Sequence, residues 1–178
     1  MHDPHTLARL IEVNVPLFER FLDGFDEGNR AAQAPGCPNH LIWTLGHVSL
    51  TMHRMSDRLG GSDEPGPLPE SDFYTGDGRG GQRDRYDTEA ICFGSTPLPE
   101  PDRYPGLARG RQIFSDACAR FREETLRADH AKLTRMSRWG SGEQAVGDLV
   151  MRVVLHNATH AGQLTDLRRG LGLKRVIG

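Results

Sequence analysis

The sequence predicts an all-α protein, folded as a four-helix bundle with long crossover connections. In four segments, apolar residues recur at the spacing of an amphipathic helix. No segment of comparable length shows the alternation of a half-buried strand. The chain of 178 residues can bury one substantial core, so we expect a single domain over residues 1–178.

The first helix is expected at about residues 3–25. Asp3 is a favourable N-cap, and Pro4 suits the first helical position. Pro16 removes one backbone donor, so we expect a kink or a short break near residues 12–15. The apolar face of this helix carries Leu7, Leu10, Ile11, Leu17, Phe18, Phe21, Leu22 and Phe25.

The second helix is expected at about residues 39–60, where a pair of glycines stops it. Residues 61–104 are dense in Gly and Pro and predict a long connection, because such composition favours turns over periodic structure. Long connections of this kind are often functional or mobile. Within it, the stretch "EAICFGS" at 89–95 could dock an apolar patch or form a short helix.

The third and fourth helices are expected at about residues 105–127 and 142–169. In the third, apolar side chains share one face, and Arg and Glu occupy the other. The fourth opens with Ser141–Gln144, which fits an S-x-x-Q capping box, and Gly170 ends it.

Composition excludes several classes of partner. The formal net charge is −2 and Lys and Arg are scattered, so we expect no nucleic acid partner. We also expect no membrane span and no signal peptide, which gives a cytoplasmic protein by default. The odd number of cysteines and the lack of a CxxC pair predict that Cys37, Cys92 and Cys118 are reduced thiols. We expect Cys118 to lie in the core.

The stretch "LHNATHAGQL" contains the first candidate for a chemical site. On a helix, His156 and His160 differ by about 40° around the axis and about 6 Å along it, so both imidazoles can reach one point. Such a pair either packs through hydrogen bonds or holds a metal ion, and its spacing leaves both readings open. Metalloprotease chemistry is excluded, because Asn157 stands where the HExxH motif needs Glu.

A third ligand is expected from the second helix. In "WTLGH", Trp43 and His47 lie one turn apart on one face, which makes His47 the best candidate. Gly46 costs about 0.5–1 kcal/mol relative to Ala, so it indicates either a close approach of backbone or ligand, or plain helix packing. His53 should face elsewhere, and His40 is expected to be a pocket-rim or capping residue.

Two segments, "NHLIWTLGHVSLTMHRM" and "LHNATHAGQLTDLRRGLG", resemble the signature segments of the DinB-like (DinB/YfiT-like) family. The family pattern is W-x-x-x-H on the second helix and H-x-x-x-H-x-G-Q-L on the fourth. The stretch "FGSTPLPEPDRYPGL" is similar to the loop of a DinB subgroup that enters its third helix through Tyr-Pro. The Gly-rich loop at 76–83 has no counterpart in that pattern. The resemblance implies a four-helix bundle, commonly a homodimer, with a divalent ion held by His47, His156 and His160.

The resemblance also implies a chemistry. Three neutral histidines bind zinc, nickel, iron or cobalt and leave a position for water or substrate. A bound dication can activate water or hold a thiol as thiolate. Family members include metal-dependent transferases and isomerases that use bacillithiol, mycothiol or glutathione. We therefore expect a divalent-metal-dependent thiol S-transferase or related enzyme acting on a small molecule, with zinc or nickel favoured over iron or cobalt.

Two other functions stay open at this point: a non-catalytic metal- or small-ligand-binding bundle and, more weakly, a metal-dependent hydrolase. Arg54 could meet an anionic cofactor group or be a solvated surface residue. Trp43 could wall the cavity or pack in the core, and Gln163 could orient the last ligand. No general base stands out, and three candidates rest on residue type alone: Asp57, Asp148 and Asp166.

Overall fold

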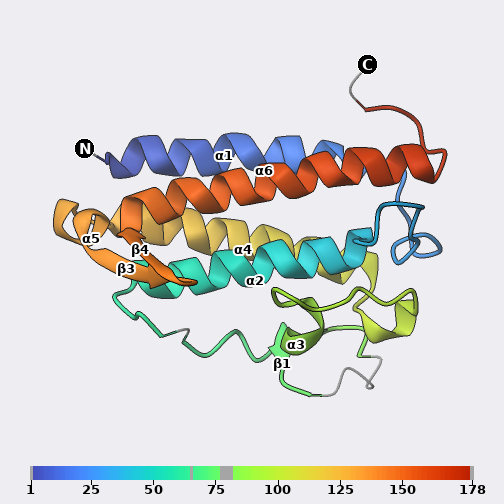
Figure 1. The fold of residues 1–178 in the computed structure, drawn as a ribbon, viewed down its shortest axis with the longest axis horizontal. Helices are drawn as coiled ribbons and strands as arrows, with labels where there is room; N and C mark the ends of the chain where they lie inside the picture. The colour runs from blue at the N-terminus through green and yellow to red at the C-terminus, as the bar shows by residue number, and fades with distance from the viewer. Residues whose placement is uncertain (1, 65, 77–81, 177–178) are drawn as a thin grey trace.

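The computed structural model describes residues 2–64, 66–76 and 82–176. It is predominantly helical, so the predicted all-α class is confirmed. Residues 77–81 of the predicted Gly-rich loop lie outside the described residues. In the described part of the chain, four long helices lie side by side (Figure 1): α1 Pro4–Arg20, α2 Leu41–Leu59, α4 Leu107–Arg127 and α6 Val146–Gly170.

The long helices pack as two antiparallel sets. α1 and α6 run in one direction, and α2 and α4 run in the other (Figure 1). α2 packs against α4 and α6, and α1 packs against the same two helices. The connections at 21–40 and 128–145 each join two helices at one end of the molecule, whereas the connection at 60–106 runs along its length. The chain therefore has one long crossover where the sequence suggested more.

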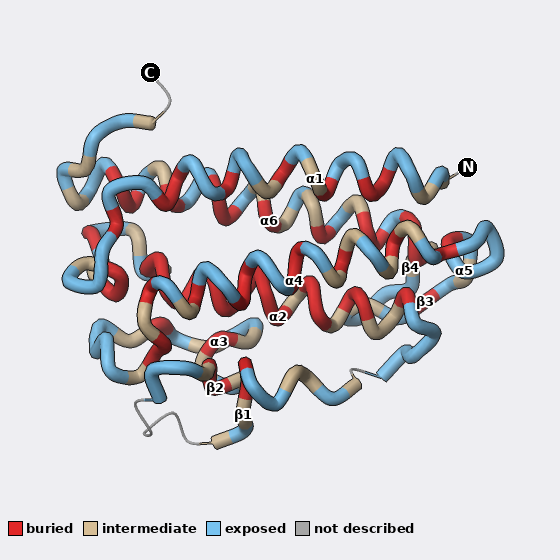
Figure 2. The backbone as a smooth tube through the Cα atoms, turned by 180° about the vertical axis from the view of Figure 1, so that it is seen from behind, coloured by how far each residue is buried: buried red, intermediate tan, exposed pale blue. Residues whose placement is uncertain are grey.

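The core lies between the long helices. Figure 2 shows buried positions along most of α2, which α4, α6 and the 60–106 connection surround. The rings of Phe18 and Phe114 stack at 4.7 Å between centroids, which joins α1 to α4. Cys118 is buried as predicted, with its Sγ 3.6 Å from Met52 Sδ, and burial raises the pKa of its thiol. Among the described residues, no helix is long and apolar enough to cross a membrane.

The start of α1 follows the sequence, but its proline does not break the helix. The Asp3 side chain accepts a hydrogen bond from the Thr6 amide at 2.8 Å, which caps the helix. The helix then continues through Pro16, so the possible break near residues 12–15 is wrong. A helix tolerates the missing donor where packing on α4 and α6 holds the rest of it in place.

The end of α1 corrects the predicted range of 3–25. The helix ends at Arg20, and a turn follows, with Gly24 at a φ of +79°. Phe21 and Phe25 are nevertheless buried, 5% and 6% exposed. The helix was predicted to reach residue 25 because the buried side chains of this turn continue the apolar spacing of the helix.

The connection after α2 is more ordered than the Gly/Pro composition predicts. A short parallel pair of strands is followed by a one-turn helix that overlaps the predicted short helix at 89–95. A 3-10 turn, η1, then leads toward α4. These elements are β1 Phe73–Tyr74, β2 Tyr86–Asp87, α3 Thr88–Ile91 and η1 Pro101–Arg103.

The predicted capping box at the start of α6 is wrong. Residues 142–145 form a strand, β4 Gly142–Ala145, paired antiparallel with β3 Met136–Trp139 after the short helix α5 His130–Thr134. Gly140 makes the turn at a φ of +63°. The Val146 amide donates to the Arg135 carbonyl at 2.9 Å, so the hairpin base takes the place of a side-chain cap.

His40 caps α2, which agrees with one of its two expected roles. Its Nδ1 accepts from the Trp43 amide at 3.2 Å, and its Nε2 donates to the Leu98 carbonyl at 2.9 Å. These bonds assign the neutral ring to the Nε2–H tautomer. The ring is fully buried beside Tyr104, and burial lowers its pKa to about 4. A proton on Nδ1 would face the Trp43 donor.

We expect His40 to make the fold sensitive to acid. The unfolded chain takes up this proton near pH 6.5 and the folded chain only near pH 4, so the neutral ring stabilises the fold above about pH 6.5. That stabilisation is lost as the pH falls toward 4. His40→Asn keeps a capping acceptor without the titration. Urea unfolding at about pH 7 and about pH 4.5 should show wild type losing on the order of 2 kcal/mol more than the variant. Equal losses would contradict this role.

Candidate metal centre

Three histidines from two helices meet between α2 and α6, where two of them are buried and His156 is half-buried. α2 supplies His47, and α6 supplies His156 and His160. The Nε2 atom of His156 lies 3.1 Å from that of His47 and 3.2 Å from that of His160. One potential ligand atom from each residue lies within 4.8 Å of the others. The structure thus brings together the three residues that the sequence predicts as a set.

Hydrogen bonds aim two of these rings. His47 Nδ1 donates to the Ile91 carbonyl at 2.7 Å, and His160 Nδ1 donates to Gln163 Oε1 at 2.9 Å. With the proton on Nδ1, each ring presents an Nε2 lone pair to its neighbours. His156 has one Nε2 and can donate a proton to only one of them. At least one Nε2 lone pair in the cluster therefore has no proton to accept. A bound cation would provide a partner for this lone pair.

Two of the three distances between these nitrogens also fit a cation. Two nitrogens bound to zinc at about 2.0–2.1 Å with a tetrahedral angle lie about 3.3 Å apart. The Nε2 atom of His156 stands 3.1 Å and 3.2 Å from its two neighbours. Gln163 contacts His160, the residue that it was expected to orient, and Asn39 Nδ2 donates to the same amide oxygen at 3.2 Å.

The three rings are neutral at physiological pH. Burial lowers the pKa of His47 and of His156, and repulsion from a protonated His47 would act in the same direction on His156. Burial and the two neighbouring imidazoles lower the pKa of His160 to about 3. Neutral imidazole is the form that binds metal, so deprotonation adds no cost to binding at pH 7.

The short helix α3 supports the α2 side of the site. Its last carbonyls have no partner within the helix, and side chains of α2 satisfy them. Trp43 Nε1 donates to the Ala90 carbonyl at 2.9 Å, next to the Ile91 carbonyl that receives His47. The Trp43 and His47 rings stack at 4.6 Å with an angle of 9°. Trp43 is buried, and its observed contacts position His47.

Gly46 allows this close approach. A Cβ atom at Gly46 would lie 2.7 Å from the Tyr86 ring and 2.9 Å from Ile91 Cδ1. Tyr86 is fully buried, and its hydroxyl donates to the Ile42 carbonyl at 3.1 Å. Of the two interpretations of Gly46, the approach of another chain segment is the one observed.

A cavity of about 660 Å³ adjoins the histidines, between α2, α6 and the β3–β4 hairpin. His47 and His156 line it, so two of the three rings face the space. Arg54 lines it too, whereas Trp43, the other residue considered for the pocket, is not among its described lining residues. The remaining lining residues are Leu50, Thr51, Arg58, Phe93, Trp139, Gly140, Ser141, Gly142, Gln144, Arg152 and Val153.

Other candidates from the sequence lie away from this cavity. His53 faces elsewhere, as predicted: its Nδ1 lies 3.2 Å from Arg120, and its ring meets Phe73 edge-on. Asp57 accepts a hydrogen bond from the same Arg120 at 2.6 Å. This network ties α2 to α4 and leaves Asp57 outside the cavity lining.

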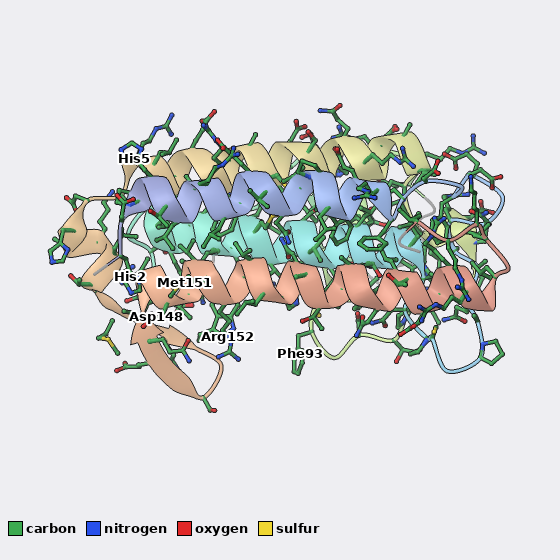
Figure 3. The ribbon with its side chains drawn as sticks, turned by 90° about the horizontal axis from the view of Figure 1, so that it is seen from above. His2, His5, Phe93, Asp148, Met151 and Arg152 are labelled. Atoms are coloured by element: carbon green, nitrogen blue, oxygen red, sulfur yellow. The ribbon has the colours of Figure 1, made fainter. Side chains whose placement is uncertain are left out.

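The two acidic residues of α6 are also engaged elsewhere. Asp148 lies 3.1 Å from His2 near the start of the chain. Figure 3 shows the two labelled side chains beside the start of α6. Asp166 pairs with Arg169 at 3.1 Å on the exposed surface. None of the three aspartates considered as a general base lines the described part of the cavity.

Sequence reasoning missed several parts of the site. Arg152 could have been found, because it precedes His156 by one helical turn. Phe93 and the Ile91 carbonyl lie in a Gly/Pro-rich connection whose path no periodicity reveals. Trp139 belongs to a hairpin that was not predicted, because residues 141–144 were interpreted as a helix capping box.

The helix order and the two histidine segments can now be compared with known proteins. A family model described as the DinB superfamily matches residues 11–164. The chain belongs to the DinB superfamily. The match extends from α1 into α6 and includes all three histidines of this DinB superfamily protein, which confirms the resemblance found in the sequence. Comparison with curated proteins and with solved structures finds no match.

We expect Gly46→Ala to destabilise the protein by about 1–3 kcal/mol, because the added methyl group overlaps the Tyr86 ring. The matched control is Gly162→Ala on α6, where nothing lies within 4 Å of an added Cβ. That change should stabilise by about 0.5–1 kcal/mol. Chemical unfolding of both variants measures the contrast. A Gly46→Ala protein as stable as Gly162→Ala would show that the segment at 86–91 does not pack here.

Proposed function

We propose that this DinB superfamily protein binds a divalent cation through His47, His156 and His160. We further propose that it is a thiol S-transferase, which joins the sulfur of a low-molecular-weight thiol to an electrophilic small molecule. The observation that carries this proposal is the convergence of the Nε2 atoms beside a cavity that reaches two of the rings. Three histidines suit zinc or nickel, and iron or cobalt are alternatives. Three protein ligands leave a coordination position for a substrate.

The residues of the chain have separable roles in this proposal. The cation would act as a Lewis acid that favours the thiolate form of a thiol. The Ile91 carbonyl and Gln163 hold the His47 and His160 rings in the tautomer that presents Nε2. The hairpin and Phe93 bound the space that a substrate enters.

The other functions have less support. Hydrolysis would need a carboxylate to activate water, and the described lining of the cavity includes no acidic side chain. A structural metal site is usually closed by a fourth protein ligand, and the group of possible ligands found among the described residues has three members. Non-catalytic binding is therefore the main alternative that an experiment must separate.

We expect purified protein to retain about one equivalent of metal per chain, measured by mass spectrometry of its elements. The metal-loaded protein should accelerate the reaction of monochlorobimane with bacillithiol, mycothiol or glutathione. His160→Ala should lose both metal and turnover. His130→Ala removes an exposed histidine on α5 and should lose neither. Metal retention without turnover for any of the thiols would favour non-catalytic binding.

We further propose that the four long helices form a bundle of the DinB type and that the bundle dimerises. Exposed apolar side chains support this assembly. Leu10, Val13 and Leu17 of α1 are 42%, 57% and 37% exposed, and their spacing places them on one helix face. Leu155 on the adjoining helix α6 is 67% exposed. Exposed apolar side chains gathered on one helix face are typical of a protein interface.

Light scattering after size-exclusion chromatography should give the mass of a homodimer. Val13→Asp should convert the protein to a monomer, because a charge in the centre of the apolar face would be buried without a partner. Glu19→Asp, an exposed conservative change on the same helix, should leave the dimer intact. A monomeric wild-type protein at micromolar concentration would refute the proposal.

A further inference from the structure

The cavity beside the histidines is strongly basic. Arg54 and Arg58 reach it from α2, and Arg152 reaches it from α6. Among the described residues that line it, none carries a negative charge. The protein as a whole has a net charge of −2, so this basic lining is a local feature.

Two of these arginines lack acidic partners. Neither Arg54 nor Arg152 forms an ion pair with a described residue, whereas Arg120 pairs with Asp57 nearby. The Nε atom of Arg54 is buried and has no hydrogen-bond partner among the described residues. A buried unpaired donor on a guanidinium is costly, so an acceptor beside Arg54 would stabilise the protein.

Arg58 is held by the walls of the cavity. It donates to the carbonyls of Arg54 and Arg138 at 3.2 Å and 3.4 Å, and its guanidinium lies 4.9 Å from the centre of the Trp139 ring. Its described partners are therefore neutral. Arg58 contributes positive charge here, while Arg54 and Arg152 have guanidinium groups without an ionic partner.

Helix geometry places Arg54 and Arg152 on the same side of the three-histidine site. Arg54 follows His47 by seven residues, and Arg152 precedes His156 by four. Because α2 and α6 run in opposite directions, both steps lead toward the hairpin end of the cavity (Figure 1). The steps correspond to about 10 Å and about 6 Å along the helix axes.

Electrostatic effects agree with this placement. A divalent cation at the histidines would add positive charge to a cavity whose described lining has no carboxylate. An anionic ligand would offset this repulsion and satisfy the guanidinium donors.

We infer that the cavity selects a thiol bearing a carboxylate, with the carboxylate on Arg54 and Arg152 and the sulfur directed to the three histidines. The position of Phe93 favours a ligand with an apolar chain between its two polar ends. It is 93% exposed, lines the same cavity, and projects on the same side of α6 as Arg152 in Figure 3. This specificity rests on the proposed thiol chemistry, but the carboxylate contact can be tested separately.

The test compares two thiols that differ in charge. 6-Mercaptohexanoate has an extended chain long enough for its sulfur to reach the histidines while its carboxylate meets the arginines. 6-Mercaptohexan-1-ol is its neutral counterpart. Binding to zinc-loaded protein can be measured by calorimetry. Tryptophan fluorescence, to which Trp139 in the cavity wall contributes, gives a second readout. We expect the dissociation constant of the acid to be at least about tenfold lower than that of the alcohol, because the alcohol cannot form the charge-assisted bonds of a carboxylate.

The arginine variants identify the source of that preference. Arg54→Gln and Arg152→Gln should each reduce the preference severalfold and leave the affinity for the alcohol unchanged. Arg20→Gln removes an exposed arginine of α1 and serves as the control. A preference that persists in both cavity variants, or equal binding of the two thiols, would overturn the inference.

Metal-free protein separates this inference from the proposed function. Hexanoate has the carboxylate without the sulfur, and it should bind weakly to zinc-free protein in a manner that depends on Arg54 and Arg152. Arginine-dependent binding of hexanoate with no added affinity from zinc and sulfur would support the anion site and refute thiol binding at the metal. Zinc-dependent binding of both thiols without a charge preference would refute the anion site alone. Failure of all three ligands to bind would overturn the inference.

Discussion

The docking of the segment at 86–91 against α2 is the contact on which the site depends. Tyr86 fills the space that Gly46 leaves, and the next residues present the unpaired carbonyls of a one-turn helix. Those carbonyls accept from Trp43 and His47, which fixes the indole and the imidazole in one stacked pair. A short helix that would be unstable alone therefore determines which nitrogen of His47 faces inward.

The same region explains why the connection after α2 contains regular structure. Tyr86 also stands against α4, where a Cβ at Gly110 would lie 2.7 Å from its hydroxyl. Two glycines on two helices thus receive one aromatic ring. Apolar burial and the bond from its hydroxyl to Ile42 hold the connection in place, although its sequence is rich in turn-forming residues.

The sequence predicted the features that depend on local periodicity. The helical spacing of His156 and His160, and the position of His47 one turn after Trp43, could be read without knowledge of the fold. The β3–β4 hairpin could not, because Ser141 and Gln144 fit a capping box as well as a turn and a strand. The α1 terminus was similarly ambiguous, since buried residues after a helix can continue its apolar pattern. Contacts between distant segments, such as the one at Gly46, carry no periodic signal.

The separation of the histidines along the chain has a consequence for biosynthesis. His47 and His156 are 109 residues apart, so a nascent polypeptide exposes the first long before the ribosome has made the second. Any ion that needs both can be captured only after α6 has joined α2. Its binding energy would then favour the completed molecule over every shorter intermediate, and metal supply in the cell would influence how long each finished copy survives.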